Sequence, residues 1–176
     1  MKETISIGDF TVRDVRVEDA PSIAAYADNP RVAANLRDVF PHPYRLEDAQ
    51  GFLAHVMQQL PPTVFAIATE AEAVGVIGLT LGEDVHRFTA ELGYWLGEPF
   101  WGRGVMTSAV RVVVAHGFRE LGLLRIHADP YAGNVGSARV LEKAGFELEG
   151  RMRANVFKNG RVLDQLLYST IREGVA

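Results

Sequence analysis

The chain has 176 residues, of which 48% are hydrophobic and 23% are charged, which is ordinary for a soluble domain with a real core. Its net charge of −4 and pI of about 5.7 do not supply the broad basic field of a general nucleic-acid binder. We therefore expect no nucleic-acid partner, and any anion must be held locally. The absence of cysteine excludes disulfides, thiolate metal sites and a covalent thioester on a side chain of this protein.

The sequence also lacks the signals of a membrane, metal or multidomain protein. Its first residues contain no signal-peptide core, and no apolar run reaches the roughly 18 residues of a membrane span, so we expect a cytoplasmic protein without a membrane partner. No repeat or long polar linker is visible, which favours a single domain over residues 1–176. The five histidines have neither H-x-x-x-H nor H-E-x-x-H spacing, so we predict no metal site.

The amino-terminal part of the chain alternates between strand and helix patterns. An alternating strand at 10–14 is followed by a helix at 19–26 with proline in its first turn, and Asn29 can cap a further short helix. The segment 40–44 contains two prolines, which lack a backbone donor, so it must be irregular. A longer helix then covers 46–60 and ends at a proline pair.

Strands dominate the rest of the chain. Further strands are predicted at 63–69, 74–81, 89–96, 125–130, 146–156 and 162–171, and further helices at 106–121 and 134–145. The dipeptide Asn159-Gly160 is the strongest hairpin signal and joins the last two strands. This order predicts an α+β fold with α/β/α layers, in which a mixed, mostly antiparallel central sheet of six to seven strands carries helices on both faces.

A glycine-bearing turn lies between the strand at 89–96 and the helix that follows it. Gly102 and Gly104 let several backbone N–H groups converge with no Cβ in the way, and the helix N-terminus adds about half a positive charge. Such a turn can hold a diphosphate. The same pattern is equally typical of a simple tight turn, and its spacing fits neither a P-loop nor the dinucleotide fingerprint.

Three segments carry a family resemblance. They are E-L-G-Y-W-L at Glu91–Leu96, F-W-G-R-G at Phe100–Gly104, and N-x-x-S-x-x-x-L-E-K-x-G-F at Asn134–Phe146. With these motifs the chain resembles the GNAT superfamily of N-acetyltransferases, and within it the Rim-type branch, which acetylates N-terminal α-amines of ribosomal proteins among other amines. The resemblance implies a GNAT-like fold over most of the chain and acetyl-CoA as co-substrate. Without cysteine, transfer would go directly from CoA to the acceptor.

The chain departs from the superfamily pattern at three positions. Trp101 stands where the turn usually begins with Arg or Gln, and Met106 stands where it usually ends in Gly or Ala. Neither change removes a backbone donor, although both alter the side chains around the phosphates. Leu141 occupies the position of the tyrosine that serves other members as general acid, so this acid cannot be assumed.

The resemblance assigns a set of CoA-binding residues. The diphosphate would rest on the turn with one arginine at its rim, and the pantetheine arm would run beside the strand at 92–96. The residues so assigned are Tyr94, Trp95, Leu96, Gly102, Arg103, Gly104, Val105, Met106, Thr107, Asn134 and Lys143. Local capping is the alternative for Asn134, and a solvated helix face is the default for Lys143.

Amine acylation also needs a base and an acid for the departing thiolate. We select Glu91 as base, because it shares a strand face with Gly93 and Trp95, and Ser137 and Tyr131 as candidate acids. The alternatives are a solvent-facing carboxylate, a capping serine and a packed ring. A weak base suffices for an α-amine, which is roughly a tenth neutral at pH 7, whereas lysine is under about a thousandth neutral.

The acceptor is the least defined part of the prediction. The irregular segment 40–44 and the residues just before it supply candidates for an acceptor pocket, namely Arg37, Phe40, His42 and Tyr44, with loop packing as the alternative. A protein N-terminus is the acceptor that we favour, and a small amine such as a polyamine, amino acid or antibiotic is the alternative. A non-catalytic acyl-CoA sensor is a third interpretation. Related proteins are frequently dimers, so the resemblance is compatible with a homodimer.

Overall fold

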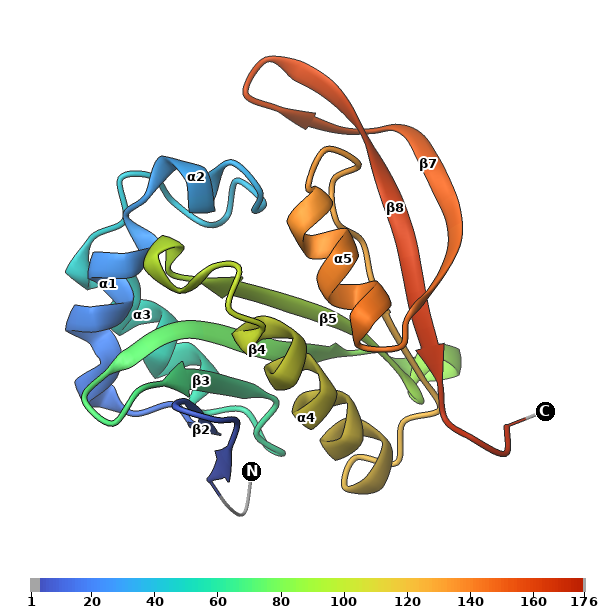
Figure 1. The fold of residues 1–176 in the computed structure, drawn as a ribbon, viewed down its shortest axis with the longest axis horizontal. Coiled ribbons are helices and arrows are strands. Elements are labelled where there is room, and N and C mark those ends of the chain that lie inside the picture. The colour runs from blue at the N-terminus through green and yellow to red at the C-terminus, as the bar shows by residue number, and fades with distance from the viewer. Residues whose placement is uncertain (1–3, 176) are drawn as a thin grey trace. The chain divides into compact units, whose positions relative to one another are not determined.

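The structure, a computed structural model, describes residues 4–175 (Figure 1). The chain divides into two compact units. The first consists of Met1–Gly78 and Tyr94–Ala109, and the second of Leu79–Gly93 and Val110–Ala176.

The helices and strands are divided between the two units. The elements of the first unit are β1 (Ile5–Ser6), β2 (Thr11–Asp14), η1 (Val17–Asp19), α1 (Ala20–Ala27), α2 (Pro30–Ala33), α3 (Leu46–Val56), β3 (Val64–Ala68) and η3 (Glu98–Phe100). The second unit contains η2 (Asp84–His86), β6 (Arg125–Ala128), α5 (Val135–Lys143), β7 (Glu147–Lys158) and β8 (Arg161–Ile171). Three elements contribute residues to both units: β4 (Ala73–Leu81), β5 (Thr89–Leu96) and α4 (Val105–Arg119).

Eight strands in the described part of the chain form a sheet with the order β1-β2-β3-β4-β5-β6-β8-β7. The pairs β1–β2, β2–β3, β3–β4, β6–β8 and β7–β8 are antiparallel, whereas β5 and β6 are parallel. The predicted mixed, mostly antiparallel α+β fold is therefore confirmed. The predicted number of six to seven strands was low, because the two-residue strand β1 is too short to give an alternating pattern.

The core of the first unit lies between two helices and the sheet. Residues of α1 and α3 pack against β3 and β4, and the buried members of this cluster are Ala20, Ile23, Ala27, Tyr44, Ala49, Leu53, Ala66, Ala73 and Val76. The helix α3 ends at Val56, four residues before the predicted end. The bonds from Gln58 N–H to His55 O (3.3 Å) and from Gln59 N–H to Val56 O (3.2 Å) are of the tighter i→i−3 type, which closes the helix before the prolines.

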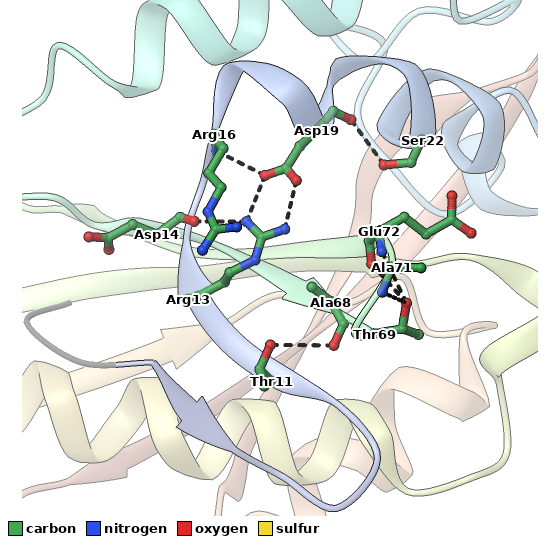
Figure 2. Close-up of polar contacts among 10 residues, drawn as sticks. All are labelled: Thr11, Arg13, Asp14, Arg16, Asp19, Ser22, Ala68, Thr69, Ala71 and Glu72. Carbon is green, nitrogen blue, oxygen red and sulfur yellow. Dashed lines mark hydrogen bonds and ion pairs between the residues drawn. The ribbon is translucent and has the colours of Figure 1, made fainter.

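A buried ion pair joins β2 to the start of α1 (Figure 2). Arg13 donates from Nη1 to Oδ2 of Asp19 (2.8 Å) and from Nη2 to Oδ1 (2.7 Å). The backbone N–H of Arg16 donates to the same carboxylate at 2.8 Å. Both partners are buried, with exposed fractions of 9% for Arg13 and 5% for Asp19. Each charge therefore depends on the other for its compensation.

The second unit ends in the long hairpin β7–β8. Its turn residues Asn159 and Gly160 both have positive φ, of 51° and 74°, as the Asn-Gly signal predicts. A bulge interrupts β7 near Ala154, whose φ is 53° and whose N–H donates to Oδ1 of Asp164 at 2.8 Å. This bond, followed by the one from Arg151 Nε (2.6 Å), holds the pKa of Asp164 below its ordinary value. The bulge is thus fixed by a side chain on the neighbouring strand.

Candidate active site

The glycine turn has the backbone geometry of an anion site. Gly102 and Gly104 have φ values of 74° and 78°, and a Cβ at either would meet nothing within 4 Å, so backbone conformation rather than space favours glycine here. Helix α4 begins at Val105, and its first bond runs from Ser108 N–H to Gly104 O at 3.1 Å. The N–H groups at positions 105–107 therefore precede any intrahelical acceptor and can donate to a ligand.

An aromatic cluster anchors the start of this turn. The ring of Phe100 makes edge contacts with Phe10 and Tyr26, at centroid distances of 5.7 and 5.4 Å. Arg103 lies over the Phe100 ring as well, with Cζ 5.8 Å from its centroid. A Cβ at Gly97 would lie 2.9 Å from Cδ1 of Tyr26, so a tyrosine of α1 packs directly against this glycine.

Trp101, the departure at the first turn position, has specific partners. Its indole N–H donates to Leu96 O at 2.7 Å, which ties the turn to the end of β5. The guanidinium of Arg31 lies over the ring, 5.5 Å from its centroid, and forms an ion pair with Glu98. Nδ2 of Asn29 also donates to Glu98, at 2.8 Å. Sequence reasoning missed Arg31 and Glu98, because their contacts join residues far apart in the chain.

Two of the predicted acceptor residues, His42 and Tyr44, contact Asp28, the residue that follows α1. Tyr44 N–H donates to Oδ1 of Asp28 at 3.0 Å, and the same oxygen lies 3.4 Å from Nδ1 of His42. The rings of Phe40 and Tyr44 are 4.7 Å apart, and Phe40 also contacts Trp95 at 5.9 Å. The structure thus brings these aromatic residues together with β5.

The members of this segment differ in accessibility. Tyr44 belongs to the buried core, and burial, assisted by the charge of Asp48, raises its pKa to about 12. Its phenol is therefore neutral at any physiological pH. His42 and Arg37 are exposed to solvent to a greater extent than Tyr44, and Phe40 is half-buried.

In the second unit, the predicted base has an ionisable neighbour. Glu91 is the register partner of His127 in the parallel ladder, which covers Thr89–Glu91 of β5. Nδ1 of His127 lies 3.4 Å from Oδ1 of Asp129. This bond is the main cause of the raised pKa of His127, which burial opposes and the charges of Asp129 and Glu91 support. Sequence reasoning did not select His127, although its alternation in the strand with buried Ile126 could have placed it on the face of Glu91.

The remaining candidates lie in α5 and in the loop before it. Oδ1 of Asn134 accepts from Ser137 N–H at 3.1 Å, so the capping role considered for this residue is present. Tyr131 is buried and forms a bridge with Gln165 of β8. The carbonyl of Lys143 accepts from Arg111 Nη2 at 2.5 Å, which ties the end of α5 to α4.

Comparison with known proteins identifies the family to which this fold and these motifs belong. Residues 9–147 match the family model described as the acetyltransferase (GNAT) domain. The chain therefore belongs to the GNAT family, and the prediction of an N-acetyltransferase is confirmed at this level.

Individual relatives agree with this assignment. The putative ribosomal N-acetyltransferase YdaF of Bacillus subtilis is 30% identical over 149 residues, which cover 84% of this chain and 75% of that protein. The probable N-acetyltransferase YjcK of the same organism is 54% identical over 72 residues, but this match covers only 41% of the chain and 40% of YjcK. Among solved structures, the ribosomal-protein-S5-alanine acetyltransferase from Vibrio fischeri has a TM-score of 0.85 with 98% of each chain covered and 23% identity, a likeness in fold.

Two further observations concern residues 4–175. No group of three or more His, Asp or Glu side chains there is arranged to hold a metal ion. No helix in the same range is long and apolar enough to cross a membrane.

Proposed function

We propose that this protein transfers the acetyl group of acetyl-CoA directly to the α-amine of a protein N-terminus in the cytoplasm. The observation that carries the donor half is the turn at 102–107, where two left-handed glycines precede the first N–H groups of a 15-residue helix. Its backbone donors and the positive end of α4 suit the diphosphate of CoA. The positive charge of Arg103, at the exposed rim of the turn, supports the same ligand.

The reaction follows from the residues that the chain offers. The neutral amine attacks the thioester carbonyl carbon, the tetrahedral oxyanion collapses, and the C–S bond breaks with the electron pair on sulfur. The chain has no cysteine to carry the acyl group on a thioester intermediate, so transfer is direct. We assign removal of the amine proton, directly or through water, to Glu91. Ser137 and Tyr131 are our candidates to protonate the CoA thiolate.

The acceptor proposal has two supports. A protein α-amine has an ordinary pKa of about 7.7–8.0 and needs little assistance to lose its proton, unlike a lysine side chain at about 10.4. This matches a site whose proposed base is a half-buried carboxylate. The names of YdaF and of the Vibrio fischeri enzyme, which refer to ribosomal acceptors, point in the same direction.

One assay separates the acceptor classes. Purified protein is mixed with acetyl-CoA, and free thiol is monitored with unblocked peptides, the same peptides N-acetylated, polyamines, amino acids and aminoglycosides. We expect thiol release with unblocked peptides and none with their blocked forms. Preference for a polyamine, amino acid or aminoglycoside would replace the acceptor proposal. Tight CoA binding with slow thiol release that no amine accelerates would show a sensor instead.

A further inference from the structure

The donor turn and the acceptor segment of the first unit are physically connected. Arg31 lies on α2, which leads into the segment 34–44 that contains the acceptor candidates. Its guanidinium covers the ring of Trp101 and pairs with Glu98, and both of these residues shortly precede the glycines of the turn. We refer to these three residues as the clasp.

Helix α2 depends on such contacts. It has four residues, which is far too short for a helix that is stable alone. Its N-terminus is capped by Asn29, whose Oδ1 accepts from Arg31 N–H at 2.8 Å. The amide of this same asparagine donates to Glu98 at 2.8 Å, so the cap itself is held by a residue beside the turn.

The segment that carries Glu98 and Trp101 has packed and hydrogen-bonded neighbours. The ring of Phe100 is packed between Phe10 and Tyr26, and the indole N–H of Trp101 is fixed on Leu96 O. Residues 101–104, in contrast, are exposed, and they include both left-handed glycines. A ligand that binds the N–H groups of this turn restricts the part of it that carries Trp101.

We propose that Arg31 and Glu98 are positioning residues that couple CoA binding at the turn to the order of residues 30–44, so that donor binding prepares the acceptor side. This inference rests on the proposed function for the identity of the donor. The coupling is reciprocal, because any factor by which CoA stabilises the segment is also the factor by which an ordered segment tightens CoA. Arg31 touches neither substrate in this role and acts through Trp101 and α2.

The expected size of the coupling follows from the contacts. Arg31 is largely exposed, so its ion pair is screened, and the cation–π contact is of the same modest class. Loss of contacts of this strength should change the equilibrium constant for local opening of the segment by about two- to fivefold.

Hydrogen–deuterium exchange with CoA alone as ligand tests the proposal without knowledge of the acceptor. The amides of Val32, Ala33, Ala34 and Phe40 report on the segment, since each donates to a nearby backbone carbonyl. In the parent protein, we expect CoA to slow exchange in peptides covering the turn and, about two- to fivefold, in those covering 30–44. In Arg31→Met and Glu98→Gln, the slowing should persist at the turn and largely disappear from 30–44. Arg31→Lys, which keeps the positive charge, should restore part of the slowing of exchange in 30–44.

Arg87→Met is the matched control. Arg87 makes the same kind of contact, with Cζ 4.9 Å from the Phe88 centroid, but it lies in the β4–β5 connection. Arg87→Met should leave the CoA-induced slowing of exchange in 30–44 unchanged. If Arg87→Met removed this slowing as fully as Arg31→Met does, the specific role of Arg31 would be overturned. Protection of the turn without protection of 30–44 in the parent would overturn the coupling while leaving the CoA site intact. Failure of the parent to bind CoA in calorimetry would instead overturn the proposed function.

Discussion

Glu91 and His127 face each other as register partners in the parallel ladder between β5 and β6. A carboxylate and an imidazole are thereby placed side by side, and the imidazole is also held by Asp129 at 3.4 Å. Because the charge of Glu91 contributes to the raised pKa of His127, the two groups are electrostatically coupled. The predictions on the titration and stability of His127 use this coupling.

Replacement of Glu91 by Gln should lower turnover while sparing the donor site. General-base assistance is worth about 100-fold at the low end of its usual range, and an α-amine needs little of it, so we expect kcat to fall by up to about 100-fold with the Kd for CoA within about twofold of the parent. Stopped assays over a range of pH, together with calorimetry, provide both measurements. Glu147→Gln is the control, because Glu147 is an exposed carboxylate on β7 of the same unit. A Glu91→Gln enzyme with the parent's turnover and pH–rate profile would remove Glu91 from the mechanism.

The pKa of His127 should respond to its two acidic neighbours in a defined order. The hydrogen bond to Asp129 is the larger cause of the raised pKa, and the charge of Glu91 is a smaller one. In an NMR titration, the pKa of His127 should therefore fall in both Asp129→Asn and Glu91→Gln, and further in Asp129→Asn. The reverse order would show that the contact with Asp129 is not the main stabilising interaction of the imidazolium.

The same shift predicts a pH dependence of stability. A histidine whose pKa is raised in the folded state contributes stability that is fully present below the unfolded value of about 6.5 and is lost as pH rises through the folded pKa. The difference in urea midpoint between the parent and His127→Gln should thus be largest near pH 5.5, about one unit below the unfolded value, and should shrink as pH rises through the folded pKa. A difference that is constant across this range, or that grows with pH, would contradict the assignment.

Local signals explain most of what the sequence predicted correctly. The strand Thr89–Leu96 has the predicted boundaries because Ala90 and Leu92 alternate with less buried neighbours and the strand ends just before Gly97. Asn29 caps α2 and Asn134 caps α5, since an Asn side chain can satisfy an N–H two or three residues ahead without tertiary help. The Asn159-Gly160 turn likewise depends only on its two residues.

The features that sequence analysis missed depend on contacts distant in the chain. Arg31 meets Glu98 and Trp101 across roughly 70 residues, and no periodic pattern encodes that meeting. The bulge at Ala154 relies on a carboxylate from the next strand. The position of Glu91 beside a histidine depends on the parallel register between β5 and β6. That register is set by the whole sheet rather than by either strand.

Gly104→Asp should weaken CoA binding by more than tenfold, because it places a carboxylate among the donors proposed for the diphosphate. Gly8→Asp is a closely matched control. Both glycines have φ of 78°, and a Cβ at either would meet nothing within 4 Å, so the two substitutions should impose similar backbone strain. Calorimetry with CoA should separate them, with Gly8→Asp at the parent's Kd. Equal affinities in the two variants would show that the turn does not hold the diphosphate.

The Arg13–Asp19 ion pair, which joins β2 to the start of α1, should contribute strongly to the stability of the first unit. Removing one partner leaves the other charge buried and unpaired, so Arg13→Met and Asp19→Asn should each lower the free energy of unfolding by about 3–5 kcal/mol. Asp19→Asn should retain a higher free energy of unfolding than Asp19→Ala, because an amide oxygen can still accept from Arg16 N–H, as the carboxylate does at 2.8 Å. Urea unfolding of Arg13→Met, Asp19→Leu and the double variant completes a double-mutant cycle. We expect the double variant to lose less than the sum of the single losses, since it leaves no unpaired charge, whereas strict additivity would show that the two side chains do not stabilise each other.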